Sequence, residues 1–422
     1  MKVASPKAME FETVCVIGLG YIGLPTSAIL ATHGIAVIGV DVNPRVVDTI
    51  NHGRIHIVEP ELEAVVSGVV STGRLRAVNR PEPADAFIIA VPTPFCDGHA
   101  PDLSYVESAA GSIAPHLKRG SLVILESTSP VGTTGQLAAW LAALRPDLRF
   151  PPQPGGTADV NVVYCPERVL PGHVLHELVY NDRIIGGLTP RCSARAAALY
   201  GAFLKGQCVI TDARTAEMAK LSENAFRDVN IAFANELSAI ADKLDINVWE
   251  LIELANRHPR VNILKPGPGV GGHCIAVDPW FIVHSAPEES RLIRTAREIN
   301  DAKPGRIVQR VIQRAARFSK PMVACLGLSY KADIDDLRES PAVEIVRDLA
   351  FAAVGSLLVV EPNIGSLPPQ LENLPGVTLA KLGEALEQAD IILLLADHRQ
   401  FKNIDRRIVM EKVVIDTRGV WR

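Results

Sequence analysis

The chain has 422 residues, of which 48% are hydrophobic and 21% charged, and a formal net charge of -4. This length predicts two or three domains, because one hydrophobic core stops growing at about 250–300 residues. The composition is typical of a globular protein, and the slightly acidic balance argues against a nucleic-acid-binding protein. We therefore expect no nucleic-acid partner.

Cysteine usage and hydropathy indicate the compartment. The seven cysteines are scattered and form no CxxC pair, a pattern that favours reduced thiols in a cytoplasm. The lead-in 1–10 lacks the apolar core of a signal peptide. Apolar runs such as 391–396 are far shorter than the ~20 residues of a membrane helix. We expect a cytoplasmic protein without a membrane segment.

The first motif is a glycine-rich turn between a strand and a helix. The apolar run 13–17 leads into Gly18-Leu-Gly20-Tyr-Ile-Gly23, and the next predicted strand ends at Asp41. In a dinucleotide-binding unit the first glycine makes the turn, the second admits the pyrophosphate and the third allows close helix packing. An acid about 20 residues further on binds a ribose hydroxyl and repels a 2′-phosphate. The spacing therefore predicts an NAD site.

Polar residues follow several later strands of the same domain. Because ligands bind beyond the carboxyl ends of parallel strands, Thr93, Thr128 and Glu167 are candidates to line a cleft. Taken singly, each of them is better explained by ordinary turn and capping chemistry, so only their recurrence at successive strand ends favours function. The strands are predicted at 86–91, 122–125 and 162–164.

Residues 215–244 contain neither Pro nor Gly and predict a helix of about 45 Å, long enough for a domain spine or a dimer interface. Lys220 and Asn224 lie four residues apart and so share one face. Asn is a poor helix former, so its presence in the middle of a helix calls for an explanation. Either the face makes a solvated or buried polar contact, or it stabilises developing negative charge. Periodicity does not choose between these readings.

The segment 265–281, KPGPGVGGHCIAVDPWF, places Cys274 after a glycine-rich loop and Asp278 four residues later. Backbone N–H groups of such a loop favour a thiolate, and the thiolate is a nucleophile. The alternative is an ordinary turn with a small buried cysteine. A metal site built from His173, His176, His273 and Cys274 is discounted, since these residues lack a second ligand cluster.

Strand and helix patterns alternate again after Pro304-Gly305. Strands are predicted at 322–328, 357–361, 389–395 and 413–416, with helices at 339–353 and 383–388. This second α/β domain has no GxGxxG motif, and its loop 329–340 carries Lys331 and Arg338, which suit phosphate oxygens. The predicted fold is α/β, with two Rossmann-like, doubly wound parallel-sheet domains joined by a helical domain with a long spine helix. We expect the domains to span 1–205, 206–305 and 306–422.

Taken together, these motifs resemble the UDP-glucose/GDP-mannose dehydrogenase family almost from end to end. The resemblance is carried by GLGYIGLP, VPTPF, LESTSPVG, YCPERVLPG, NDRIIGG, AEMAKLSENAFRDVNIAFANEL, ANRHPRVNILKPGPGVGGHCIAVDPWF, DDLRESPA and DTRGVWR. The glucose branch has a Lys before the aspartate, where this chain has Val277, and a shorter loop without His273. These departures resemble the N-acetylmannosamine branch.

The resemblance implies roles for individual residues. Cys274 would be the nucleophile, Lys220 and Asn224 its oxyanion and proton partners, and Asp278 a water-activating or Lys-orienting acid. Glu167 would assist thioester hydrolysis, and Thr128 would lie near the catalytic water and the nicotinamide. The implied NAD contacts are Gly18, Gly20, Tyr21, Ile22, Gly23, Asp41, Arg45, Pro92, Thr93 and Thr128. The implied substrate contacts are Arg168, Val169, Leu170, Lys220, Asn224, Arg260, Asn262, Gly271, Tyr330, Lys331 and Arg338, with Arg260 reaching across a homodimer interface.

The implied reaction is the four-electron oxidation of C6 of UDP-N-acetylmannosamine to the uronate, with two NAD⁺ per turnover, for bacterial surface polysaccharide synthesis. The same reaction on UDP-N-acetylglucosamine or another UDP-N-acetylhexosamine stays open, because nothing in the residues fixes the sugar stereochemistry. A two-electron β-hydroxyacid dehydrogenase would need neither the cysteine loop nor a third domain. A non-catalytic NAD-binding regulatory protein would be expected to lack some of Cys274, Lys220, Asn224 and Asp278.

Overall fold

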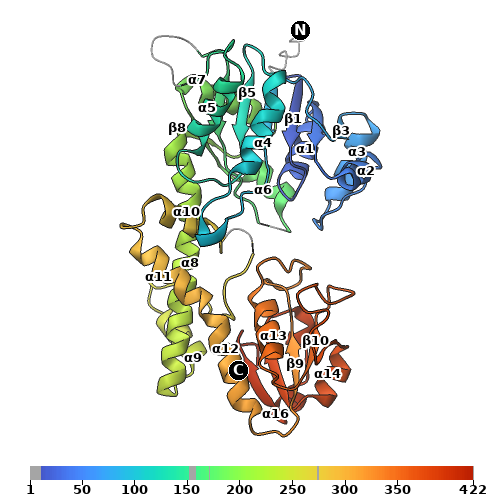
Figure 1. The fold of residues 1–422 in the computed structure, drawn as a ribbon, viewed down its shortest axis with the longest axis vertical. Helices are drawn as coiled ribbons and strands as arrows, with labels where there is room; N and C mark the ends of the chain where they lie inside the picture. The colour runs from blue at the N-terminus through green and yellow to red at the C-terminus, as the bar shows by residue number, and fades with distance from the viewer. Residues whose placement is uncertain (1–10, 152–157, 171, 273–274, 422) are drawn as a thin grey trace, which may run out of the picture. The chain divides into compact units, whose positions relative to one another are not determined.

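The computed structural model describes residues 11–151, 158–170, 172–272 and 275–421. The chain divides into two compact units, the first ending at Ser222 and the second beginning at Glu223. The division falls inside the long helix α8 (Ala213–Leu244), whose 32 residues correspond to about 48 Å (Figure 1). Within the described residues, no helix is both long and apolar enough to cross a membrane.

The first unit is built on an eight-stranded sheet with the order β3-β2-β1-β4-β5-β6-β7-β8. Its neighbouring strands run parallel except for β6 and β7, which pair antiparallel. The strands are β1 (Thr13–Ile17), β2 (Ala36–Val40), β3 (Leu75–Val78), β4 (Ala86–Ile89), β5 (Leu122–Leu125), β6 (Asn161–Tyr164), β7 (Arg183–Gly187) and β8 (Cys208–Asp212).

Helices cover both faces of this sheet, because the side chains of each strand alternate between two cores. On β1, Val14 and Val16 pack in one core, whereas Cys15 and Ile17 pack in the other. The helical elements are α1 (Gly23–Thr32), α2 (Pro44–Asn51), α3 (Leu62–Ser71), η1 (Asp97–His99), α4 (Ser104–Ile113), η2 (Ala114–His116), α5 (Thr133–Leu144), α6 (Val174–Tyr180) and α7 (Pro190–Tyr200).

The second unit combines the rest of α8 and a group of helices with a five-stranded parallel sheet of order β11-β10-β9-β12-β13. This sheet also separates two cores, with Val323 and Cys325 of β9 in one and Ala324 and Leu326 in the other. The strands are β9 (Met322–Leu326), β10 (Ser356–Val360), β11 (Val377–Leu379), β12 (Ile391–Leu394) and β13 (Val413–Asp416). The helices are α9 (Val248–Ala255), α10 (Asp278–Ser285), α11 (Arg291–Asp301), α12 (Lys303–Ala315), α13 (Pro341–Phe351), α14 (Leu382–Gln388), α15 (Arg399–Lys402) and α16 (Arg406–Met410).

The predicted α/β fold class with its long spine helix is confirmed, and three details were wrong. The larger sheet is not wholly parallel, since β7 reverses against β6. Strands β3, β7, β8 and β11 were not predicted; β8, for example, is largely exposed and lacks a buried run. Asp278 begins helix α10, which was also not predicted. The predicted domain boundaries stay a prediction; the one at 305/306 lies within α12.

Candidate active site

The glycine turn after β1 is closed at two of its glycines and open at the third. Gly18 has φ 92° and its N–H donates to the Val40 carbonyl over 2.8 Å. A Cβ on Gly18 would lie 2.5 Å from the Ala90 oxygen, and one on Gly23 would lie 1.8 Å from the Gly18 oxygen. A Cβ on Gly20 would meet nothing within 4 Å. The open position is the one that a pyrophosphate approaches in a dinucleotide site.

Asp41 lies beside this turn, directly after β2. Its Oδ2 accepts the Leu19 N–H at 3.2 Å and its Oδ1 accepts the Asn43 N–H at 2.9 Å. Helix α1 has no side-chain cap at its N-terminus; the Leu24 N–H donates to the Gly20 carbonyl at 3.2 Å and Pro25 carries no N–H, so a phosphate would be met by the Gly20–Gly23 turn and the positive end of the helix dipole. These features fit a dinucleotide with its ribose at Asp41. Of the other predicted NAD contacts, Tyr21 and Ile22 are half-buried and Arg45 is exposed on α2.

The loops after β4 and β5 are joined to each other. The Thr93 hydroxyl donates to the Thr128 carbonyl at 2.6 Å, and the Ser127 hydroxyl donates to the Val91 carbonyl at 2.7 Å. Thr93 is buried, whereas Pro92 beside it is exposed. The structure thus brings Thr93 and Thr128 together at adjacent strand ends.

Glu167, after β6, is held by an arginine that the sequence did not single out. Its Oε2 lies 2.6 Å from Arg183 Nη2, and its Oε1 accepts the Arg168 N–H at 2.7 Å. The other arm of Arg183 reaches Glu126 Oε1 at 3.2 Å. An arginine at the head of the apolar run RIIGG was the available signal, since arginines are almost never fully buried unless they are paired.

The segment beyond Glu167 is held by its own backbone contacts. The Arg168 side chain donates to the Asp182 carbonyl at 3.3 Å, and the Leu170 N–H donates to Glu177 at 2.7 Å. Val169 is half-buried and Leu170 is exposed. These residues therefore form a shaped, partly open loop next to Glu167.

Two of the predicted catalytic residues are in direct contact. Asn224 on α8 donates through Nδ2 to Asp278 Oδ2 at 2.5 Å, and Asp278 is only 3% exposed. Lys220 lies one turn earlier on α8 and is half-buried. This contact gives the mid-helix Asn a buried polar partner, and it ties α8 to the end of the glycine-rich segment. Cys274 and His273 lie outside the described residues.

The described part of the glycine-rich segment is packed on both sides. The Gly267 N–H donates to Asn235 Oδ1 on α8 at 3.0 Å, and the Gly272 N–H donates to the Arg338 carbonyl at 3.2 Å. A Cβ on Gly272, whose φ is 84°, would lie 2.9 Å from the Tyr330 ring. Gly271 is equally tight, with the Tyr330 Cβ 2.7 Å from the position of a Cβ. Glycines are needed here because the loop after β9 lies against the main chain.

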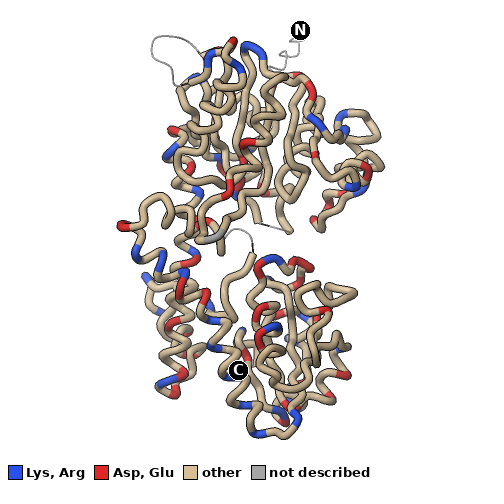
Figure 2. Tube along the Cα trace, viewed as in Figure 1, with Lys and Arg blue, Asp and Glu red and all other residues tan. Residues whose placement is uncertain are grey.

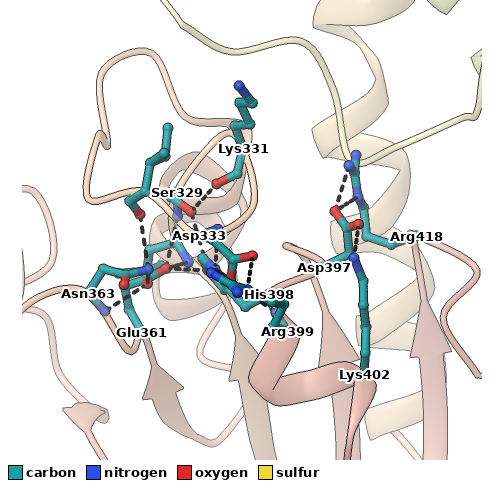
Figure 3. A network of polar contacts seen from close by, with 12 residues as sticks. Ser329, Lys331, Asp333, Glu361, Asn363, Asp397, His398, Arg399, Lys402 and Arg418 are labelled. Atoms are coloured by element: carbon teal, nitrogen blue, oxygen red, sulfur yellow. Dashed lines mark hydrogen bonds and ion pairs between the residues drawn. The ribbon is translucent and has the colours of Figure 1, made fainter. Parts of the chain in front are cut away.

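Arg418, in the motif DTRGVWR, also reaches the glycine-rich segment. Its guanidinium would lie 2.8 Å from a Cβ on Gly267, and it pairs with Asp397 through bonds of 3.1 and 2.8 Å (Figure 3). Lys402 pairs with the same carboxylate at 2.9 Å. Together, these cations lower the pKa of Asp397 to about 2 although burial raises it. The motif DTRGVWR marked the end of the chain in the sequence, but only the fold brings Arg418 to Gly267.

The second sheet repeats the turn geometry of the first but fills it with its own side chains. Glu361, directly after β10, accepts the Leu328 N–H through Oε2 at 2.8 Å, as Asp41 accepts that of Leu19. Unlike Asp41, Glu361 also accepts a hydrogen bond from a histidine, with His398 Nε2 3.0 Å from its Oε2. Its Oε1 accepts the Asn363 N–H at 3.1 Å (Figure 3). Both oxygens of Glu361 are thus taken by protein donors, since Oε1 also accepts from the Asn363 side chain at 3.1 Å.

The Glu361 cluster also fixes the loop that carries Lys331. His398 Nδ1 accepts the Asp333 N–H at 2.8 Å, so the imidazole proton lies on Nε2. The Ser329 hydroxyl donates to the Lys331 carbonyl at 2.7 Å, and the Lys331 side chain extends away from His398 (Figure 3). Arg338 at the far end of the loop is exposed and pairs with Asp336 at 2.7 Å. Lys331 and Arg338 thus project from an anchored loop.

The remaining predicted residues lie at the surface. Arg260 and Asn262 are exposed, as are His173 and His176, and His176 stacks on Tyr180 at 4.5 Å. In the part of the chain that the structure describes, no group of three His, Cys, Asp or Glu side chains is arranged for a metal ion. Lys and Arg are interspersed with Asp and Glu along both units (Figure 2).

The contrast between Gly20 and Gly23 generates a first prediction. Gly20→Ala should leave folding unchanged and raise the Kd for NAD⁺ about tenfold, because its methyl group occupies the open position. Gly23→Ala should instead lower the free energy of unfolding by about 1–3 kcal/mol, because its methyl group meets the Gly18 carbonyl. Calorimetric titration and urea unfolding measure both. Unchanged NAD⁺ affinity in Gly20→Ala would contradict the assignment.

The Glu361 cluster generates a second prediction. Burial raises the pKa of Glu361, but hydrogen bonds from His398 and from the Leu328 and Ser329 N–H groups lower it by more. The pKa of Glu361 therefore lies below its ordinary value. Its stabilising contribution is therefore present above the ordinary carboxyl pKa and lost as the pH falls through the folded-state pKa. His398→Ala should cost about 1.5–3 kcal/mol at pH 7 and move acid unfolding to higher pH.

Urea unfolding between pH 3 and pH 7 measures both effects. The exposed His284 of the same unit provides the control variant His284→Ala, which should change neither quantity. An acid-unfolding midpoint that stays in place in His398→Ala would show that His398 does not hold the Glu361 carboxylate.

Comparisons with known proteins agree along the whole chain. Three models of the UDP-glucose/GDP-mannose dehydrogenase family match: the NAD binding domain at residues 12–204, the central domain at 214–302 and the UDP binding domain at 324–422. The NDP-N-acetyl-D-galactosaminuronic acid dehydrogenase of Ralstonia nicotianae is 64% identical over 413 residues, covering 98% of this chain and 97% of that protein.

The UDP-N-acetyl-D-mannosamine dehydrogenase of Yersinia pestis is 62% identical over 422 residues, covering 98% of this chain and 100% of that protein. Among solved structures, the UDP-D-ManNAc dehydrogenase from Pyrococcus horikoshii superimposes with a TM-score of 0.87 at 40% identity, covering 97% of this chain and 96% of that one. The glycine turn beside Asp41 is thus part of an NAD binding domain, and the chain belongs to the UDP-glucose/GDP-mannose dehydrogenase family.

Proposed function

We propose that this protein is an NAD-dependent UDP-N-acetyl-D-mannosamine 6-dehydrogenase, which oxidises C6 of its substrate to the carboxylate. The observation that carries the proposal is the contact between Asn224 and Asp278, residues 54 positions apart that the reaction needs side by side. Relatives above 60% identity whose names specify a UDP- or NDP-N-acetylhexosamine derivative support the class of sugar.

The proposed reaction proceeds through a thioester on Cys274. NAD⁺ held at the Gly18–Gly23 turn and Asp41 would accept the hydride in each of the two oxidations. The Cys274 thiolate adds to the intermediate aldehyde, the thiohemiacetal is oxidised to a thioester, and water cleaves the C–S bond to release the carboxylate and the thiol. The overall balance is one alcohol, two NAD⁺ and one water giving one carboxylate, two NADH and three protons.

The roles proposed for the surrounding residues follow their chemistry. Lys220 and Asn224 stabilise the alkoxide and the tetrahedral oxyanions, an effect worth about 3 kcal/mol per donor. Asp278 orients these donors or activates water, and Glu167 receives the water proton during hydrolysis. Thr128 is proposed to lie near the catalytic water and the nicotinamide.

We propose that residues 1–205 bind NAD, that 206–305 supply the cysteine loop and the dimer contact, and that 306–422 bind the UDP group. The positions matched by the three family models support this division. Lys331 and Arg338 are the proposed UDP contacts, and Tyr330, Gly271 and Asn262 line the sugar. The six cysteines within the described residues are all free thiols, which supports a reducing cytoplasm. The uronate product would serve bacterial surface polysaccharide synthesis.

The stoichiometry of the reaction tests the proposal. With UDP-N-acetylmannosamine we expect two NADH per uronate, and no uronate from Cys274→Ala. The exposed Cys96 provides the control, since Cys96→Ala should keep full activity. One NADH per product, or uronate formed by Cys274→Ala, would overturn the mechanism.

A comparison of sugars tests the substrate. The rivals are UDP-N-acetylglucosamine, the C2 epimer, and UDP-N-acetylgalactosamine, which differs at both C2 and C4; the galactosaminuronic acid name of the Ralstonia relative favours testing the second. We expect kcat/KM for UDP-N-acetylmannosamine to exceed that for each rival and for UDP-glucose. A higher value for either N-acetylhexosamine rival would reassign the substrate while keeping the chemistry.

We also propose a homodimer that forms through α8. Phe226, Phe233 and Ile240 recur every seven residues on this helix and are 69%, 50% and 48% exposed. With the 60% exposed Leu244 they form an apolar stripe that suits a second copy of the same helix. Arg260 is exposed, as we expect of a residue that reaches the active site of the neighbouring subunit.

Light scattering tests the dimer. The double variant Phe226→Ser, Phe233→Ser should be monomeric and should lose activity, because Arg260 then no longer reaches its partner's substrate. Phe351→Ser, at a phenylalanine 70% exposed on α13, should remain dimeric and active. A monomeric wild-type protein with full activity would rule out the dimer.

A further inference from the structure

A buried group of ions lies behind Glu167 in the first unit. Arg183, the first residue of β7, bridges Glu126 and Glu167, and the three side chains are only 5%, 0% and 9% exposed. Its Nη1 lies 3.2 Å from Glu126 Oε1, and its Nη2 lies 2.6 Å from Glu167 Oε2. Two carboxylates therefore share one buried guanidinium.

Tyr200 makes two further contacts with this group. The Tyr200 hydroxyl donates to Glu126 Oε1 at 2.7 Å, and the Arg183 guanidinium lies over the Tyr200 ring at 4.3 Å from its centre. Tyr200 thus holds Glu126, and Tyr200 and Glu126 together hold Arg183. The group forms a continuous chain of contacts from Tyr200 on α7 to Glu167 at the end of β6.

Such a group is costly if its purpose is stability alone. Burial raises the pKa of Glu126 to about 7, with the neighbouring Glu167 adding to the rise and Arg183 opposing it. Replacing buried ions by packed apolar residues is often neutral or stabilising. The retention of three charged side chains here therefore calls for a reason beyond folding.

We infer that Arg183 is a positioning residue, which with Glu126 and Tyr200 holds Glu167 in the orientation needed for thioester hydrolysis. The inference rests on the proposed function, in which Glu167 receives a proton from the attacking water. Arg183 binds one carboxylate oxygen of Glu167, and the Arg168 N–H binds the other. Each oxygen keeps a second lone pair, so Glu167 is fixed without being blocked.

The step that this arrangement serves is balanced without a further reactant. The water oxygen forms a bond to the thioester carbon, the water proton passes to Glu167, and the C–S bond breaks to return the Cys274 thiolate. Arg183 keeps its charge throughout, because its guanidinium does not deprotonate. Its removal should slow hydrolysis and leave both hydride transfers intact.

Rapid-quench kinetics with UDP-N-acetylmannosamine and NAD⁺ test the inference. In Arg183→Met we expect a burst of two NADH per site, followed by turnover slowed about 100-fold, the usual contribution of a positioned general base. Intact-protein mass should show an acyl adduct that the wild type does not accumulate. Arg183→Lys, which keeps the charge without the fork, should recover part of the rate.

Two further variants keep the test decisive if Arg183→Met does not fold. Glu126→Gln preserves the shape and the acceptor oxygen, and it should show the same burst and adduct with a smaller slowing. Arg195→Met removes another packed arginine of this unit, one that stacks on Phe11 at 4.6 Å, and it should accumulate no adduct.

The inference would be overturned if Arg183→Met and Glu126→Gln are both slow but show a burst below one NADH and no acyl adduct. The slow step would then come before the thioester forms. If the wild type itself forms only one NADH per product, the proposed function fails instead. The two failures are therefore distinguishable.

Discussion

One face of helix α8 carries a largely buried polar stripe, which holds the segments that pack against this helix in each unit. Glu217, Asn224, Asp228, Asn235 and Ser238 follow one another at helical spacing, and each has a partner outside the helix. Glu217 binds the N–H groups of Gly132 and Thr134 at the start of α5, and Asn235 binds the Gly267 N–H. These hydrogen bonds form together only when the helix presents this one face to its partners.

The stripe continues into a network that supports the same segment. Asn235 donates to Asn300 at 2.9 Å, Asn300 donates to Asp228 at 2.8 Å, and Arg297 donates to Asp228 at 2.6 Å. Buried groups of this kind are costly when one partner is lost, so the network favours a single arrangement of α8, α11 and the glycine-rich segment. The mid-helix asparagines are thereby explained as structural acceptors and donors as well as candidate catalytic groups.

The two sheets show one turn used in two ways. Both place a glycine and a leucine after the first strand and an acid after the second, and in both the acid binds the leucine N–H. Asp41 accepts the Leu19 and Asn43 N–H groups, whereas Glu361 also accepts from the side chains of His398 and Asn363. The same fold therefore binds a dinucleotide in one unit and leaves the loop with Lys331 for a different contact in the other.

The sequence by itself determined the features that depend on local pattern. Apolar runs placed β1, β5 and β13 at their observed bounds, and the freedom from Pro and Gly placed α8 within two residues. The glycine spacing and Asp41 predicted the dinucleotide turn because that geometry involves neighbouring segments only. Strand β8 was missed because an exposed strand has no buried run to reveal it.

Only the tertiary structure decided which distant side chains meet. The pairing of Asn224 with Asp278, the approach of Arg418 to Gly267 and the bridge from Arg183 to Glu126 and Glu167 join residues between 16 and 151 positions apart. Periodicity assigns a side chain to a face but does not name its partner. The partner is set by strand order and helix packing, because only these bring separate strand ends and loops to the same place.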